Sequence, residues 1–114
     1  MANNYKKGVL VKRHWGEYKV IHTNEKFTIK TLTILPGKCT SLQTHKYRHE
    51  HWIVVEGKIA VELNGKTHKL GENEYIYIKK GYKHKLLNKS KKTAILTETQ
   101  QGNILDENDI KRFD

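Results

Sequence analysis

The stretch of sequence that decides the fold is GKCTSLQTHKYRHEHWIVVEG, residues 37–57. Between its two terminal glycines it carries Gln43, His45 and Glu50. Residues two apart on a strand point to the same face of a sheet, so Gln43 and His45 can both point inward. Glu50 opens the next strand across a short turn, and a later stretch, GYKHKLLN, supplies His84 from a distant strand. The pattern predicts a β-protein with polar side chains gathered inside it.

Strand-like segments of alternating or continuous apolar residues run through the whole chain. They cover residues 8–12, 17–23, 26–35, 52–55, 59–63, 66–70, 75–78, 84–88 and 93–99. Asn64-Gly65 is typical of a tight hairpin turn, whereas the continuous apolar run 52–55 is read as a strand covered on both faces. Short strands with frequent turns predict an all-β sandwich or barrel, and a closed jelly roll hides its edges economically. The tail, residues 106–114, is expected to form one helical turn.

Length, charge and cysteine content exclude several classes of protein. The 114 residues are enough for a single domain, residues 1–114, and too few for two. Lys and Arg number 22 against 12 Asp and Glu, but only three are Arg, which indicates a solvated surface and no nucleic-acid partner. No apolar run is long enough to span a membrane and no secretory signal is present, so no membrane partner is expected. The single cysteine, Cys39, indicates a reducing compartment, the cytoplasm.

The spacing of the polar residues resembles the two sequence motifs of the cupin superfamily. The first motif is matched at each spacing by Gly37, Gln43, His45, Glu50 and Gly57. The second is matched by Gly81, His84 and Asn88 but departs at two turn positions, where Lys79 replaces a usual proline and Asn73 a usual glycine. The resemblance implies a cupin double-stranded β-helix, a jelly-roll barrel, with a metal site inside it. The implied ligands are Gln43, His45, Glu50 and His84, which suit Zn²⁺ first and also Mn, Fe, Co or Ni. Such a set leaves positions open for water or substrate, as in a catalytic site.

The residues around the motif resemble one family more closely, the type II mannose-6-phosphate isomerases. The resemblance is carried by RHWGEY at 13–18, by PG and SLQTH within 36–45, by RHEHW at 48–52, by VVEG at 54–57, and by the C-terminal segment 98–112. In most members this cupin follows a mannose-1-phosphate guanylyltransferase domain, for which 114 residues leave no room. The resemblance therefore implies a stand-alone isomerase domain, although His14 replaces a proline of the family signature and Ile104 a common tyrosine.

The family reaction interconverts mannose 6-phosphate and fructose 6-phosphate. The resemblance thus implies a metal-dependent sugar-phosphate aldose–ketose isomerase, with a small phosphorylated sugar as its partner. The sequence does not identify the base that moves the proton between C2 and C1; the candidates are Glu17, His49 and Glu98. The phosphate calls for an Arg fork or a Lys, and the candidates in order are Arg48, Arg13, Arg112 and Lys30. For Arg13 and Arg112 a structural ion pair is the alternative.

Other functions stay open at this point. The chain could be a cupin epimerase or isomerase of another sugar or sugar nucleotide, or a non-catalytic cupin that binds a sugar phosphate. An iron dioxygenase would share the ligand chemistry, but nothing beyond the cupin motif supports one. The intact ligand set favours an enzyme, because a non-catalytic cupin that only senses a sugar phosphate would tolerate the loss of metal ligands. A homodimer is expected, since cupins that resemble this chain often pair through strand exchange or sheet packing.

Overall fold

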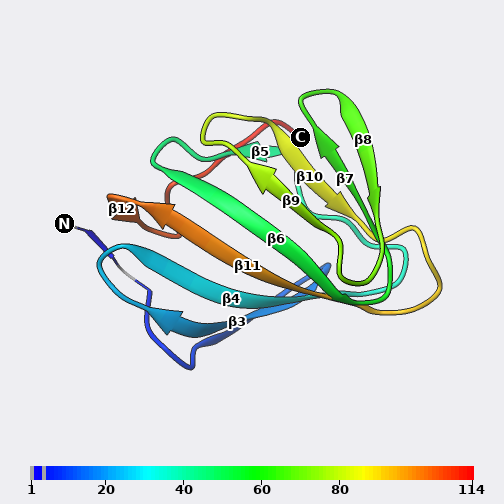
Figure 1. The fold of residues 1–114 in the computed structure, drawn as a ribbon, viewed down its shortest axis with the longest axis horizontal. Helices are drawn as coiled ribbons and strands as arrows, with labels where there is room; N and C mark the ends of the chain where they lie inside the picture. Colours follow the sequence, from blue (N-terminus) through cyan, green and yellow to red (C-terminus); the bar gives the residue numbers. More distant parts are fainter. Residues whose placement is uncertain (1, 4) are drawn as a thin grey trace.

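The computed structural model describes residues 2–3 and 5–114, which form two facing antiparallel sheets and contain no helix (Figure 1). The six-stranded sheet has the order β2 (Leu10–Arg13), β3 (Gly16–Thr23), β4 (Phe27–Ile34), β11 (Ala94–Gly102), β6 (Arg48–Glu56), β9 (Tyr75–Ile78). The five-stranded sheet has the order β13 (Lys111–Arg112), β5 (Gln43–Thr44), β10 (His84–Leu87), β7 (Ile59–Leu63), β8 (Lys66–Leu70). A parallel pair, β1 (Ala2–Asn3) with β12 (Ile104–Leu105), forms a separate two-stranded sheet.

The all-β prediction is confirmed, and the local turn signals explain much of the strand order. Asn64 and Gly65, with φ of 47° and 84°, turn the chain between β7 and β8, as the Asn-Gly dipeptide predicts. Gly57 closes the first motif with φ of +83°, and a Cβ there would lie 2.9 Å from the Thr93 carbonyl oxygen. Only glycine accepts both that conformation and that approach, so this motif glycine serves the backbone.

Two local predictions are wrong. The strand at 52–55 is covered on one face only, because Ile53 and Val55 are 47% and 52% exposed while Trp52 and Val54 are buried. Within the described chain, no second layer packs on the outer face of the six-stranded sheet at this point. The tail forms a turn and then β13 instead of a helical turn, because its backbone pairs with the free edge of β5.

The inner face of the six-stranded sheet is apolar at one end and polar at the other. On β11, the inward residues change from Leu96 to Glu98 and Gln100, all of them buried. The register aligns this change across the neighbouring strands. Leu96 lies opposite Leu32 and Val54, Glu98 opposite Lys30 and Trp52, and Gln100 opposite Thr28 and Glu50. The apolar end supplies the core, and the polar end supplies the walls of a site.

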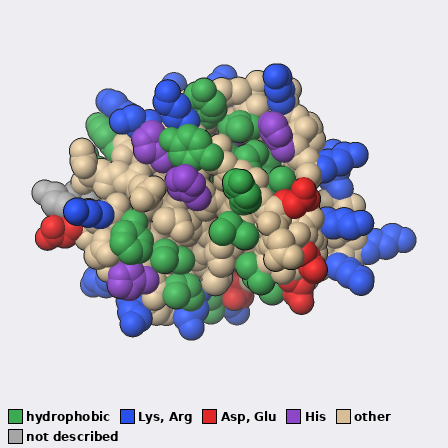
Figure 2. All heavy atoms as spheres, in the orientation of Figure 1, with side chains coloured by type: hydrophobic (Ala, Val, Ile, Leu, Met, Phe, Trp, Pro, Cys, Tyr) green, Lys and Arg blue, Asp and Glu red, His purple; other side chains and the backbone are tan. Residues whose placement is uncertain are grey.

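The outer face of the same sheet carries hydrophobic side chains and histidines over its middle, with Lys and Arg around its outline (Figure 2). Its exposed apolar residues include Ile53, Val55, Tyr75 and Tyr77. The described residues include no helix of the length and apolar character needed to cross a membrane.

Candidate metal centre

The four implied metal ligands come from strands of both sheets and from the loop between β5 and β6. Gln43 on β5 lies directly opposite His84 on β10 in the antiparallel register. His45 follows β5 in the short loop to β6, where Glu50 is an inward residue. The side chains of all four residues line one cavity of about 310 Å³ between the two sheets. The fold thus brings together the set that the sequence motif implies.

Three of these side chains are close enough to share one ion. Single ligand atoms of His45, Glu50 and His84 all lie within 4.8 Å of one another, and each residue is buried. Ligand atoms around one tetrahedral zinc ion, each roughly 2.0–2.2 Å from it, lie about 3.4 Å apart, so metal binding would draw the three side chains slightly closer together. Among them, His45 Nε2 and Glu50 Oε2 lie 3.2 Å apart.

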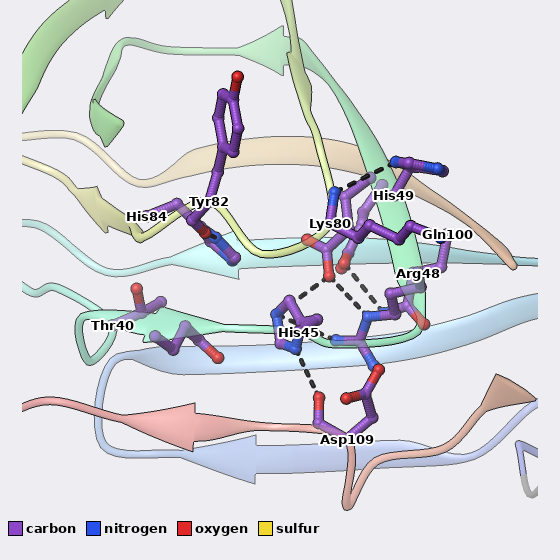
Figure 3. A network of polar contacts seen from close by, with 12 residues as sticks. Thr40, His45, Arg48, His49, Lys80, Tyr82, His84, Gln100 and Asp109 are labelled. Atoms are coloured by element: carbon purple, nitrogen blue, oxygen red, sulfur yellow. Dashed lines mark hydrogen bonds and ion pairs between the residues drawn. The ribbon is translucent and has the colours of Figure 1, made fainter. Parts of the chain in front are cut away.

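Backbone carbonyls orient both imidazole rings for metal binding. His45 Nδ1 lies 2.6 Å from the Asp109 carbonyl oxygen, and His84 Nδ1 lies 2.9 Å from that of Tyr82 (Figure 3). Because a carbonyl oxygen only accepts, each Nδ1 carries a proton, which leaves Nε2 as the ring atom that can bind a metal. This is the arrangement that outer partners impose on metal-ligating histidines. Burial lowers the pKa of His45 to about 4, so the ring is neutral at pH 7, as a ligand must be.

Glu50 is held as a carboxylate by its neighbours. Burial by itself would raise the pKa of Glu50, but the interactions with His45, Arg48 and His84 hold it well below its ordinary value. Arg48 Nε donates to Glu50 Oε2 at 2.8 Å, and Trp52 Nε1 donates to Oε1 at 3.0 Å. A buried, ionised carboxylate beside two imidazoles fits a divalent metal such as Zn²⁺. Gln43 Nε2 donates to the Ser41 carbonyl at 3.4 Å, so the amide oxygen of Gln43 is the atom that could serve as a further metal ligand.

The four residues predicted for the phosphate all line the cavity, in two different settings. Arg48 and Lys30 are 5% and 3% exposed, whereas Arg13 and Arg112 are exposed. Neither Arg13 nor Arg112 forms an ion pair with a carboxylate of the described residues. The two exposed arginines are therefore the ones whose guanidinium groups remain available to a ligand.

Arg48 and Lys30 already have internal partners. Besides Glu50, Arg48 donates to the Tyr5 hydroxyl and the Asp106 carbonyl, both at 3.1 Å, and its Nη2 lies 3.3 Å from His45 Nε2. Lys30 donates to the Tyr5 hydroxyl at 3.1 Å and to Glu107 at 3.2 Å. Its ammonium also lies 4.3 Å and 4.2 Å from the ring centroids of Tyr5 and Tyr18. These contacts give both residues a role in holding the cavity wall.

Among the candidate bases, Glu98 lines the cavity and the other two do not. Burial raises the pKa of Glu98 to about 8, and the nearby charge of Glu50 adds to the rise. His49 lies on the outer side of β6, where its Nδ1 accepts from the Tyr77 hydroxyl at 2.9 Å and the Lys80 amide at 3.1 Å. Glu17 sits on β3 with the opposite parity to the buried Tyr18.

Some residues of the centre escaped sequence reasoning. Asp109 and Tyr82 contact the two histidine rings through main-chain carbonyls, which no side-chain motif reports. Tyr5 contacts both Lys30 and Arg48 from the N-terminal segment, and no pattern singled it out. Asp109 does lie in the C-terminal segment that resembles the isomerase family, which is the one signal that could have drawn attention to it.

Solved structures similar to this chain identify its fold. Capsular polysaccharide assembling protein CapF of Staphylococcus aureus matches with a TM-score of 0.81 at 17% identity, covering 93% of this chain and 32% of that one. The cupin domain of Schizosaccharomyces pombe Cnp3 matches with a TM-score of 0.73 at 17% identity, covering 75% of this chain and 64% of that one. Identities this low speak for the fold alone, and that fold is the cupin double-stranded β-helix, an all-β jelly-roll barrel.

Sequence relationships then define the family. The model of the mannose-6-phosphate isomerase C-terminal domain matches residues 2–114, so this chain belongs to that family. Mannose-1-phosphate guanylyltransferase ManC of Salmonella typhimurium is 43% identical over 104 residues, 91% of this chain and 22% of that protein. Alginate biosynthesis protein AlgA of Pseudomonas syringae is 39% identical, again over 91% and 22%. The chain thus spans about a fifth of the length of these relatives.

Proposed function

We propose that this chain is a metal-dependent sugar-phosphate aldose–ketose isomerase that interconverts mannose 6-phosphate and fructose 6-phosphate. The observation that carries the proposal is one cavity lined by His45, Glu50 and His84 together with Glu98. Two exposed arginines, Arg13 and Arg112, line the same cavity. The site thus combines metal ligands, a proton carrier and anion-binding groups, which are the three parts this reaction needs. Membership of the isomerase family supports the choice of reaction.

The metal ligands are His45, Glu50, His84 and the amide oxygen of Gln43. A divalent ion held by them, Zn²⁺ first and otherwise Mn, Fe, Co or Ni, would act as a Lewis acid toward the oxygens at C1 and C2 of the sugar. Arg48 keeps Glu50 ionised and oriented through its 2.8 Å hydrogen bond. The Asp109 and Tyr82 carbonyls keep both histidines in the ligating tautomer.

Glu98 is the residue we assign to proton transfer. It removes the proton from C2 of the aldose to give an enediol, then returns it to C1, while a hydroxyl proton passes from O2 to O1. A carboxyl with a pKa near 8 can both accept and release a proton close to neutral pH. Gln100 Nε2 donates to Glu98 Oε2 at 3.0 Å and orients the carboxyl group.

Arg13 and Arg112 are the residues we assign to the phosphate. Arg13 lies at the end of β2 and Arg112 on β13, so they approach the cavity from different sheets. Two guanidinium groups match a phosphate dianion in charge and hydrogen-bond geometry. Phosphate binding there would hold the sugar with its other end toward the metal ligands.

The decisive experiment measures fructose 6-phosphate formed from mannose 6-phosphate with a coupled indicator enzyme. The protein is stripped with EDTA and then given each divalent metal separately. We expect no turnover after stripping and recovery with at least one metal. Absence of turnover with every metal would refute the isomerase assignment. Turnover that EDTA leaves unchanged would refute the role of the metal.

We also propose that two copies pair through the outer face of the six-stranded sheet. Ile53, Val55, Tyr75 and Tyr77 are between 46% and 76% exposed there. Exposed apolar faces of this kind mark interaction sites. Because the chain has a net charge of +10, two copies repel each other wherever their lysines meet, so an apolar face is the favourable place for them to pair. Light scattering should give a dimer for the unchanged chain and a monomer for Val55→Lys. Leu35→Lys, at an exposed loop residue outside this face, is the control; a monomeric unchanged chain would refute the proposal.

A further inference from the structure

The C-terminal segment, residues 106–114, lies along the metal-ligand elements. Its strand β13 pairs with β5, which places Arg112 opposite Gln43 and Lys111 opposite Thr44. Beyond β13, Phe113 N donates to the Leu42 carbonyl at 2.9 Å. The segment is therefore an added strand at the edge of the sheet that carries Gln43.

Asp109 makes three contacts with the loop between β5 and β6. Its Oδ1 accepts from the backbone N–H of Lys46 at 2.8 Å, and its Oδ2 accepts from that of Tyr47 at 3.0 Å. Its carbonyl oxygen accepts from His45 Nδ1 at 2.6 Å (Figure 3). One residue thus holds the two backbone amides that follow His45 and the ring of His45 itself.

The same turn reaches Glu50 through Arg48. Asp109 N donates to the Asp106 carbonyl at 3.0 Å, and that carbonyl also accepts from Arg48 Nη1 at 3.1 Å. Arg48 Nε in turn donates to Glu50 at 2.8 Å. The C-terminal segment therefore contacts Gln43 and His45 directly and Glu50 through one intermediate residue.

We propose that Asp109 is a positioning residue of the metal centre. Its carboxylate holds the loop between β5 and β6 so that His45 presents Nε2 to the metal. The inference rests on the metal site of the proposed function, and it concerns metal affinity and coordination geometry separately from turnover. The carboxylate holds the loop and the carbonyl holds the ring, so loss of the carboxylate weakens both. Residues outside the coordination sphere that orient ligands typically change metal affinity by about 10-fold to 100-fold.

The test compares Asp109→Ala and Asp109→Asn with the unchanged chain, using Co²⁺ as the probe. Calorimetry gives the affinity of the stripped protein, and the visible absorption of bound Co²⁺ reports its coordination geometry. We expect Asp109→Ala to bind Co²⁺ about 10-fold to 100-fold more weakly with an altered spectrum. Asp109→Asn keeps the size of the side chain but offers only one acceptor oxygen, so it should show a smaller loss and remains informative if the alanine variant does not fold.

A matched control is Glu74→Ala, which also removes a carboxylate that accepts a backbone N–H, that of Gly71 at 2.7 Å, but does not line the metal cavity. This control should bind Co²⁺ like the unchanged chain. Asp109 variants that melt at a lower temperature yet keep the affinity and spectrum would overturn the inference and leave the isomerase proposal standing. Failure of the unchanged chain to bind Co²⁺ would overturn both. Metal binding that depends on Asp109 without any isomerase turnover would support the inference and refute only the function.

Discussion

Arg48 is the residue whose replacement should affect stability most directly, because it is the buried counter-charge of Glu50. Arg48 is 5% exposed and Glu50 2% exposed, and their Nε and Oε2 atoms lie 2.8 Å apart. Replacement of Arg48 by Met keeps much of the apolar volume and removes the charge together with donors to Glu50, Tyr5 and Asp106. Breaking a buried ion pair from one side typically costs about 3 to 5 kcal/mol.

We therefore expect Arg48→Met to lower the free energy of unfolding of the metal-free protein by about 3 to 5 kcal/mol at pH 7. Urea denaturation in EDTA measures this loss. Repeating the measurement with saturating Zn²⁺ should give a smaller loss, because a bound cation also compensates the charge of Glu50. Arg112→Met, at the exposed edge, should stay within about 0.5 kcal/mol of the unchanged chain.

One result would refute this reasoning. A loss below about 1 kcal/mol, equal with and without Zn²⁺, is the size expected of an exposed ion pair and not of a buried one. Arg48 would then be free to bind the phosphate, for which the sequence made it the first candidate. In that case the variant should raise KM for mannose 6-phosphate far more than Arg112→Met does.

Three further predictions concern the metal, the proton carrier and pH. His84→Ala should fold but lose its bound metal, as elemental analysis would detect; unchanged metal content removes His84 from the site. Glu98→Gln should lower kcat by at least about 100-fold with little change in metal content, and full activity would exclude it as the proton carrier. Burial raises the pKa of Glu107, but Lys30 and hydrogen bonds from Tyr18 and Lys30 outweigh burial and leave it lowered. Its folded pKa lies below its unfolded value, so its stabilising contribution is present above pH 4.5 and is lost as the pH falls further. Glu107→Gln should therefore flatten the dependence of melting temperature on pH between about 5 and 3, and an unchanged slope contradicts this.

Most of the fold could be predicted from local sequence, because strand alternation and turn chemistry act over a few residues. The strands around Leu32 and Leu86 follow their apolar alternation, and Asn64-Gly65 turns as expected. The prediction of a helical turn in the tail failed since the partner that decides its structure, β5, lies far away in sequence. The prediction that residues 52–55 are buried on both faces failed, because the sequence shows that a face is apolar but not whether another layer covers it.

For the candidate site, the sequence by itself determined which side chains are present at ligand spacing, Gln43, His45 and Glu50, and the family motif added His84. Spacing of two along a strand is a local property, so this set could be read without coordinates. Only the tertiary structure decided which charged groups are free. It pairs Arg48 with Glu50, Lys30 with Glu107 and His45 with Asp109, and it leaves Arg13 and Arg112 exposed. The physical reason is that a charge is bound or available according to distances between separate strands, which the order of residues along the chain does not contain.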